Sequence, residues 1–219
     1  MSLYSRNFPE TFSILTSNFD RDTLSRIVAF DIETFSPEGF PGDFRDPIVN
    51  FSFIAPLNGL GLLSLSIIGD VDLEGDILSL LYGFMHAFQG FYLLTYNGTK
   101  FDLEYVVRRG RLYGLNFSGV LSGMRHIDVY RFIRRVGVDM TRFDQKSVER
   151  YFGFRRVLGQ ISGDLYHLYY RSFLEEGSLE PVFYNIEDSY GCLRICSALL
   201  SFLAKKRKID NILYSFSEK

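Results

Sequence analysis

The chain has 219 residues, of which 47% are hydrophobic and 23% are charged, and its formal net charge is −2. This composition is typical of a globular protein, excludes a largely disordered chain, and suits one sizeable domain. The small negative charge also excludes capture of an anionic ligand by a strong overall positive field, so such a ligand would need a local basic patch or a metal ion.

Strand patterns and helical patterns both occur in the first half of the chain. An apolar run at the start is followed by a loop rich in Gly and Pro, and the next two apolar runs are separated by LNG, which predicts a hairpin. The predicted elements, in chain order, are strands at 26–32, 48–56 and 61–69, a helix at 72–88, a strand at 90–97 and an amphipathic helix at 100–114.

Helical patterns dominate the second half. The predicted elements are a strand at 126–133, a short helix at 144–154, a longer helix at 163–177 and a long helix at 180–206. Strands that alternate with helices predict an α/β fold with a mixed sheet covered by helices. In such folds, ligands gather at the carboxyl ends of the central strands, where the first and fourth predicted strands carry polar residues.

Acidic residues stand at three such positions. Asp31 and Glu33 end the first strand and share one face of it, because side chains alternate along a strand. Asp102 lies near the start of a predicted helix, and Tyr184 and Asp188 are one helical turn apart. Taken singly, these features are typical of a solvated strand end, a helix start and an ordinary helix face. If the Asp31 and Glu33 carboxylates are instead held close together away from water, a cation would be needed to relieve their mutual repulsion.

Together and in this order, the segments form three motifs. They are Asp31-Ile32-Glu33, Asn97 to Phe101-Asp102, and Tyr184 to Asp188. This arrangement resembles the DnaQ-like 3′-5′ exonucleases, specifically the DEDDy subgroup with Tyr in the third motif, and above all the proofreading domain of family B DNA polymerases. Glu104 is a departure, since polymerase relatives often carry Pro there.

The resemblance implies a ribonuclease H-like fold in which a mixed central β-sheet is flanked by α-helices in a single domain. It covers residues 26–205, which we expect to form the exonuclease domain, with 1–25 as an N-terminal extension and 206–219 as a C-terminal tail.

The resemblance also implies roles for individual residues around two Mg²⁺ or Mn²⁺ ions, which prefer carboxylate oxygens. Asp31 would contact both ions, Glu33 and Asp188 the water-activating ion, and Asp102 the second ion. Tyr184 would orient the attacking water, since its ordinary pKa near ~10 makes it a poor base at neutral pH.

Three further residues would contact the terminal nucleotide: Thr34, Asn97 and Phe101. The sequence leaves an alternative open for two positions of the motifs. Tyr184 fits a core tyrosine on a helix face, and Asn97 fits a turn residue in YNGT.

The expected function is metal-dependent 3′-5′ hydrolysis of nucleic acid at single-stranded or frayed 3′ ends, with DNA favoured over RNA and a role in repair or proofreading. An exoribonuclease and an inactive nucleic-acid-binding module are the alternatives. Basic clusters that could track phosphates lie at Arg108, Arg109 and Arg111, at Arg131, Arg134 and Arg135, at Arg155 and Arg156, and at 205–208.

The chain carries no pattern of secretion or membrane insertion. The start of the chain lacks the basic and apolar segments of a signal peptide, and the longest apolar stretch is shorter than the ~20 residues that span a bilayer. Cys192 and Cys196 have no second pair of metal ligands and are expected to be a buried structural pair. We therefore expect a soluble cytoplasmic protein that binds no membrane.

Overall fold

The structure is a computed structural model of the chain. It describes residues 26–39, 41, 44–57, 61–159 and 161–217; for Leu57 and residues 204–217 the backbone alone is described. The predicted N-terminal extension, residues 1–25, lies outside the described residues.

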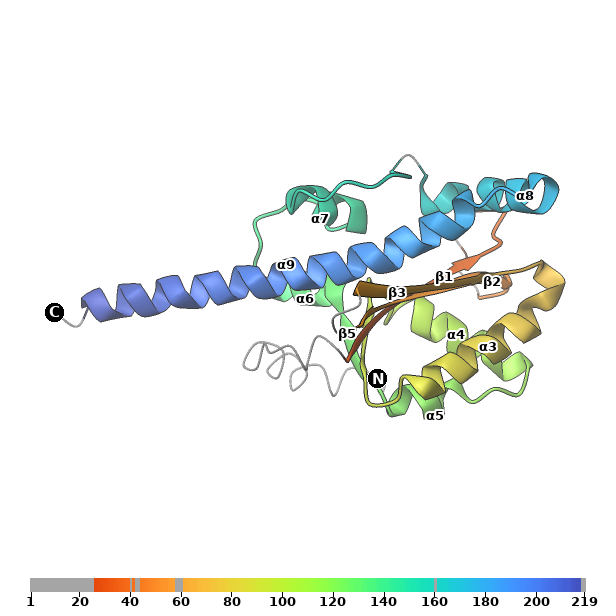
Figure 1. Cartoon of the computed structure of the whole chain (residues 1–219), viewed down its shortest axis with the longest axis horizontal. Helices are drawn as coiled ribbons and strands as arrows, with labels where there is room; N and C mark the ends of the chain where they lie inside the picture. The colour runs from red at the N-terminus through yellow and green to blue at the C-terminus, as the bar shows by residue number, and fades with distance from the viewer. Residues whose placement is uncertain (1–25, 40, 42–43, 58–60, 160, 218–219) are drawn as a thin grey trace.

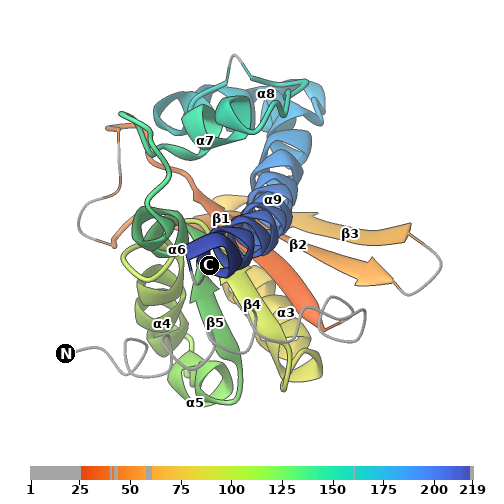
Figure 2. The same ribbon diagram turned by 90° about the vertical axis from the view of Figure 1, so that its left-hand side faces the viewer.

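A five-stranded mixed sheet forms the centre of the molecule, in the order β3-β2-β1-β4-β5 (Figures 1 and 2). β2 runs antiparallel to β1 and β3, whereas β4 and β5 run parallel to β1. This confirms the predicted α/β class with a mixed sheet. The strands are β1 (Ile27–Thr34), β2 (Ile48–Leu57), β3 (Gly61–Ile68), β4 (Tyr92–Thr95) and β5 (Arg125–Asp128).

Helices cover both faces of the sheet. In Figures 1 and 2, α9 crosses one face beneath α7 and α8, while α3, α4 and α5 cover the other. The helices are α3 (Glu74–Ala87), α4 (Asp102–Leu112), α5 (Phe117–Ser122), α6 (Val129–Val136), α7 (Gln145–Tyr151), α8 (Tyr166–Glu176) and α9 (Glu180–Ser217), with short 3₁₀ turns η2 (Val71–Leu73) and η3 (Gly163–Leu165).

The alternation of side chains in β1 decides where its carboxylates lie. Ile27 and Ala29 belong to the core beneath α9, whereas Val28 and Phe30 belong to the core beneath α3, α4 and α5. Because β1 is central, both sets are apolar, which explains the unbroken apolar run. The next odd-numbered residues of β1 are acidic and therefore emerge on the α9 face.

The segment after β5 differs from the prediction of one strand over 126–133. Only Arg125–Asp128 form β5, and the chain then turns directly into α6. The side chain of Asp128 accepts a hydrogen bond from the amide of Arg131 and so caps the new helix. A short apolar run of this kind fits the period of a strand or of a helix, and the cap by Asp128 selects the helix here. The six-residue α5, capped by Asn116, had no predicted counterpart.

The last helix is longer than the predicted 180–206. α9 continues to Ser217, and its C-terminal part projects beyond the sheet (Figure 1). The expected boundary at residue 205 therefore falls inside a continuous helix, and the division into domain and tail stays a prediction. Cys192 and Cys196 are buried on α9 and unbridged, as expected. Among the described residues, none of the helices has both the length and the apolarity needed to cross a membrane.

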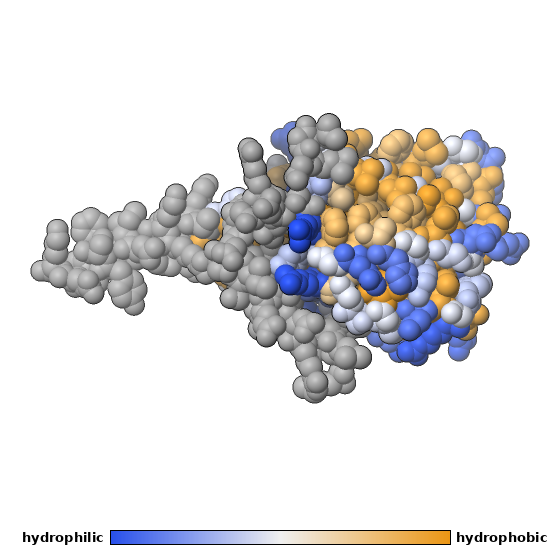
Figure 3. Space-filling view, turned by 60° about the horizontal axis from the view of Figure 1, so that its bottom comes forward, coloured by the Kyte–Doolittle hydropathy of each residue, from blue (hydrophilic) through white to orange (hydrophobic). Residues whose placement is uncertain are grey.

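One face of the molecule carries a broad apolar surface (Figure 3). β3 is the outer strand of the sheet, and its Leu62 and Leu63 are exposed, as are Leu73 and Leu80 near and on the adjacent α3. Within the sheet, β2 separates β3, which carries Leu62 and Leu63, from β1, which carries Asp31 and Glu33.

Candidate metal centre

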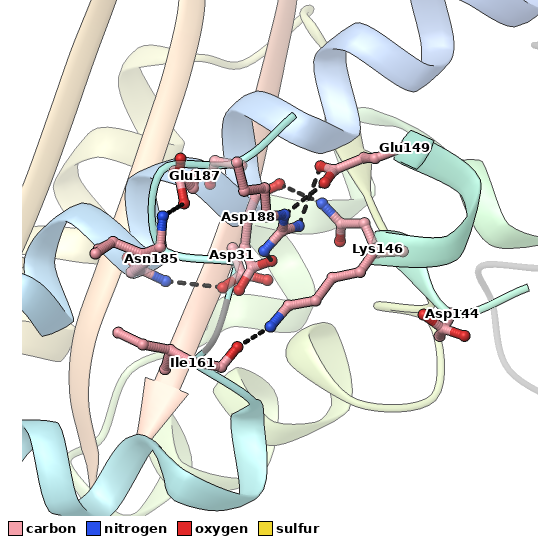
Figure 4. Close-up of polar contacts among 12 residues, drawn as sticks. Asp31, Asp144, Lys146, Glu149, Ile161, Asn185, Glu187 and Asp188 are labelled. Carbon is pink, nitrogen blue, oxygen red and sulfur yellow. Dashed lines mark hydrogen bonds and ion pairs between the residues drawn. The ribbon is translucent and has the colours of Figure 1, made fainter. Parts of the chain in front are cut away.

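The carboxylates of β1 meet α9 at one end of the sheet. Asp31 accepts a hydrogen bond of 2.8 Å at Oδ2 from the side-chain amide of Asn185 on α9 (Figure 4). The helix is fixed there by β2, since the hydroxyl of Ser52 donates to the carbonyl of Asn185 and lies 2.6 Å from the hydroxyl of Ser189. The polar start of α9 is therefore held directly over the acidic end of β1.

Three of the four predicted acids form a compact cluster. One carboxylate oxygen from each of Asp31, Glu33 and Asp188 lies within 4.8 Å of the others. Asp188 continues the face of α9 that farther along carries the buried Cys192 and Ile195, so the stripe that packs the helix on the sheet also aims this acid at β1.

Burial and nearby negative charges make Asp31 and Glu33 costly to ionise without a cation. Loss of solvation raises the pKa of Asp31 well above its ordinary value, and the charges of Asp102, Asp188 and Glu33 raise it further. The pKa of Glu33 is raised by the same burial and by Asp188 and Asp102. Positive charge at this place would restore ionised carboxylates.

Asp102 stands beside the cluster, and it is not one of the three acids whose oxygens lie within 4.8 Å of one another. It begins α4, is 3% exposed, and accepts the amide of Ile32 at 3.3 Å. Burial raises the pKa of Asp102 to about 7, although hydrogen bonds from backbone amides lower it in part. Gly98 permits this approach, since a Cβ there would overlap Thr95 and lie 2.9 Å from Oδ2 of Asp102.

Tyr184 precedes Asp188 by one turn of α9 and is buried. The ammonium of Lys146 lies 5.3 Å from the centre of its ring, and the Lys146 side chain also donates to the carbonyl of Ile161 (Figure 4). Burial and the negative charges of Asp188 and Glu33 raise the pKa of Tyr184. Its hydroxyl is therefore protonated at neutral pH and available as a hydrogen-bond donor.

A cleft of about 660 Å³ opens next to this centre. Four acids line it, namely Asp31, Glu33, Asp102 and Asp144. It is also lined by the three residues predicted to contact substrate, Thr34, Asn97 and Phe101. The other lining residues include Tyr96, Lys100, Tyr130, Arg134 and Phe143.

The backbone holds the second motif in an unusual shape. Asn97 has φ of 62°, a left-handed conformation that Asn tolerates better than most residues. Its amide donates to Asp128 at 3.0 Å, and the amide of Thr99 donates to the same carboxylate at 3.3 Å. Thr34 is buried and its hydroxyl lies 2.7 Å from that of Ser36. The turn interpretation of Asn97 is thus correct for its backbone, while its side chain lines the cleft.

The sequence did not identify Asn185, Glu149 or Arg156 as parts of the centre. Arg156 belongs to a basic cluster that was expected to track phosphates, yet its side chain is 4% exposed and Nη1 lies 2.6 Å from Oδ1 of Asp188. A signal for this arrangement was Gly191, which interrupts a long helix. A Cβ at Gly191 would overlap the carboxylate of Glu149, so the glycine marks where α7 presses against α9.

The donor set fits hard divalent cations. Clustered carboxylate oxygens are the ligands that Mg²⁺ and Mn²⁺ prefer, and neither Cys nor His joins the group of three acids. The buried Oδ1 of Asn185 lacks a hydrogen-bond partner within the described part of the chain, which leaves an acceptor for a bound water beside Asp31.

Known proteins share the fold on which this centre is built. Residues 70–199, more than half of the chain, match the RNase_H superfamily. Over 143 residues the chain is 25% identical to a DNA polymerase of Methanocaldococcus jannaschii, a match that covers 55% of this chain and 9% of the polymerase. The structure is similar to that of the family B DNA polymerase from the hyperthermophilic archaeon Pyrobaculum calidifontis, with a TM-score of 0.65 and 22% identity, over 80% of this chain and 24% of that one.

The chain thus spans less than a quarter of the length of both polymerases. The predicted likeness to DNA polymerases, and to family B in the solved structure, is confirmed. The predicted fold is confirmed as well, with its mixed sheet between helical layers. On the match over residues 70–199, the chain belongs to the ribonuclease H superfamily.

Proposed function

We propose that the protein is a metal-dependent 3′-5′ exonuclease that acts on single-stranded nucleic acid and prefers DNA. The observation that carries this proposal is the meeting of Asp31, Glu33 and Asp188 within 4.8 Å beside a cleft that Asp102 also lines. These acids come from elements far apart in the sequence, and a nuclease of this superfamily requires carboxylates for divalent ions.

Asp31, Glu33 and Asp188 would hold one Mg²⁺ or Mn²⁺ ion, and Asp102 with Asp31 would hold a second. Bound ions of this type supply a nucleophilic water at neutral pH and neutralise charge on the leaving oxygen. Asn185 fixes the orientation of the Asp31 carboxylate through its 2.8 Å hydrogen bond. Tyr184, which stays protonated, donates a hydrogen bond that orients the attacking water.

The lining of the cleft supports a polynucleotide substrate. Lys100 and Arg134 supply positive charge for phosphates, and Tyr130 and Phe143 offer aromatic rings for bases. Rings of this kind stack on unpaired bases, which favours a single strand over a duplex. The preference for DNA rests on the similarity to DNA polymerases, and an exoribonuclease is the second candidate, because the same chemistry serves both sugars.

A 5′-labelled single-stranded DNA, its RNA counterpart and a circular single-stranded DNA test the proposal side by side with Mg²⁺. We expect a ladder of shortened, still-labelled products from linear DNA, slower products from RNA, and no cleavage of the circle. Excess chelator should abolish the ladder.

Matched variants assign the activity to the centre. Asp31→Asn and Asp188→Asn should lower the rate by at least ~10³-fold, and Tyr184→Phe by about 100- to 1,000-fold, the range for the loss of one positioned hydrogen-bond donor. Asp76→Asn, at an exposed acid of α3, should leave the rate unchanged. Faster RNA than DNA cleavage would favour the exoribonuclease, and strand binding without any cleavage would favour the binding module.

A further inference from the structure

A buried cation stands at the acidic cluster. Nη1 of Arg156 lies 2.6 Å from Oδ1 of Asp188, and the charge of Arg156 lowers the pKa of Asp31 and of Glu33 against the larger effect of burial. Apart from this ionic contact, Nη1 finds no hydrogen-bond acceptor among the described residues. The metal-free centre is therefore partly neutralised by the chain itself.

The rest of the guanidinium is anchored away from the cluster. Glu149 on α7 accepts Nε of Arg156 at 2.5 Å and Nη2 at 3.1 Å, and this carboxylate is 1% exposed. Arg194 on α9 lies 3.7 Å from the same carboxylate and adds a second positive charge. The guanidinium of Arg156 therefore joins Glu149 to Asp188, two residues labelled in Figure 4. One side of Arg156 is thus fixed to α7, and the other faces the cluster.

A divalent ion and this guanidinium compete for the same negative charge. An ion held by Asp31, Glu33 and Asp188 needs an oxygen of Asp188, and Nη1 already lies on one of the two. Two positive groups a few ångströms apart repel strongly where water is scarce. Because Glu149 can keep the guanidinium paired after it leaves Asp188, withdrawal costs less than exposing an unpaired charge.

Lys146, the other cation near the centre, is engaged differently. Its ammonium donates to the carbonyl of Ile161 and lies over the ring of Tyr184, and no ion pair joins it to the three acids within the described ranges. Arg156 is therefore the cation whose position conflicts with the ion.

We propose that Arg156 is a positioning residue that occupies the metal-free centre, holds Asp188 in place, and is displaced toward Glu149 when a divalent ion binds. This inference rests on the metal centre of the proposed function. Its consequence is that Arg156 sets the metal affinity: the guanidinium stabilises the empty centre and weakens ion binding.

Binding of Mn²⁺ alone, followed by the loss of the free-ion electron paramagnetic resonance signal, tests the proposal without any reaction. We expect Arg156→Gln to bind Mn²⁺ about tenfold more tightly or better, because a competing charge is removed. Glu149→Gln should bind Mn²⁺ more weakly than the unchanged protein, because the guanidinium then has Asp188 as its main acidic partner. Arg155→Gln is the matched control, since it removes the same charge from the exposed neighbouring residue and should leave the affinity unchanged.

The unchanged protein supplies a second measurement that does not depend on the folding of a variant. With ¹⁵N-labelled arginine, the Nε–H signal that is absent in Arg156→Gln should shift when Mg²⁺ is added and saturate with the binding curve. In chelator, Arg156→Gln should melt at a lower temperature than the unchanged protein and gain more from saturating Mn²⁺.

The proposal would be overturned if Arg156→Gln bound Mn²⁺ equally or more weakly, or if the Arg156 signal did not shift when Mg²⁺ was added. Arg156 would then be a member of a structural ion pair only. If the unchanged protein binds Mn²⁺ no better than Asp31→Asn, the metal centre of the proposed function fails, and this inference fails with it. Mn²⁺ binding that depends on Asp31 but not on Arg156 overturns this inference alone.

Discussion

Asp102 is the single residue whose protonation is best placed to report on the centre. Its pKa of about 7 means that the folded, metal-free protein keeps a proton that the unfolded chain releases near its ordinary value of 3.8. A raised carboxyl pKa contributes stability that is lost as the pH rises through the folded value. Asp31 and Glu33 act in the same direction, because their pKa values are raised as well.

His126 acts in the opposite direction at lower pH, which decides the window for the experiment. Burial lowers its pKa from 6.5 to about 4, so its contribution to stability grows as the pH rises to 6.5 and is then complete. Above that pH, the carboxyl groups alone determine the slope until the two buried cysteines begin to matter.

We therefore predict that, in chelator, the free energy of unfolding falls as the pH rises from about 6.5 to about 8. Urea unfolding midpoints across this range would measure the slope. Saturating Mg²⁺ should flatten it, because the ionised carboxylates are then neutralised, and Asp102→Asn should reduce it. A stability in chelator that stays constant or rises over this range would contradict the prediction.

At the scale of whole elements, the packing of α7 on α9 depends on Gly191. A methyl group there would overlap the carboxylate of Glu149, whose charge is bound to Arg156, so the helices would have to separate. Overpacking of this kind costs about 1–3 kcal/mol, more than the ~1 kcal/mol that Ala gains over Gly inside a helix.

We predict that Gly191→Ala lowers the free energy of unfolding by up to about 2 kcal/mol in chemical denaturation, which is the overpacking cost less the gain in helix propensity. Gly83→Ala is the matched control, because Gly83 lies exposed inside α3 and a Cβ there meets nothing within 4 Å. It should raise stability by about 0.5–1 kcal/mol through its helix propensity. Equal effects of the two variants would show that α7 does not press on α9 at this glycine.

The elements also show which features are readable from sequence. β1 and β2 are identifiable as apolar runs bounded by turn residues, α9 is identifiable from its long apolar stripe, and the acids of β1 and α9 follow from local spacing. The change from β5 to α6 is not readable from the period, since the cap by Asp128 decides it. The burial of Arg156 is not readable either, because it depends on Glu149 and Asp188, which meet only after α7 docks on α9.

At the scale of the whole molecule, the residues that would bind a nucleic-acid strand and the acids that would bind metal ions come from different elements. Tyr130 and Arg134 come from α6, whereas the acids come from β1, α4 and α9. The ring of Tyr130 lies 6.0 Å from that of Tyr96, and the guanidinium of Arg134 lies 4.7 Å from the ring of Phe143. These aromatic and basic side chains can bind a nucleic-acid strand without contacting the phosphate that is hydrolysed.

A substrate that contains a single nucleotide distinguishes the role of the α6 residues from that of the metal-binding acids. We predict that Tyr130→Ala and Arg134→Gln each raise KM for single-stranded DNA by about 5- to 50-fold, the range for a lost stacking or phosphate contact. Hydrolysis of thymidine 5′-monophosphate p-nitrophenyl ester should change less than about twofold, because this ester reaches the acids without spanning α6. Arg111→Gln, at an exposed arginine outside the cleft, is the control. Equal losses on both substrates would place α6 in the chemistry instead.

The junction of β1 with α9 has a consequence for how the protein unfolds. An ion held jointly by Asp31, Glu33 and Asp188 would link the first strand of the sheet to the last helix and close the chain between them into a loop. Ligand that binds the folded state alone adds to its stability by mass action, so each tenfold rise in free ion above its Kd adds about 1.4 kcal/mol. Bound magnesium would then hold the first strand and the last helix together, and slow hydrogen exchange along the first turns of α9 would record how often this junction opens.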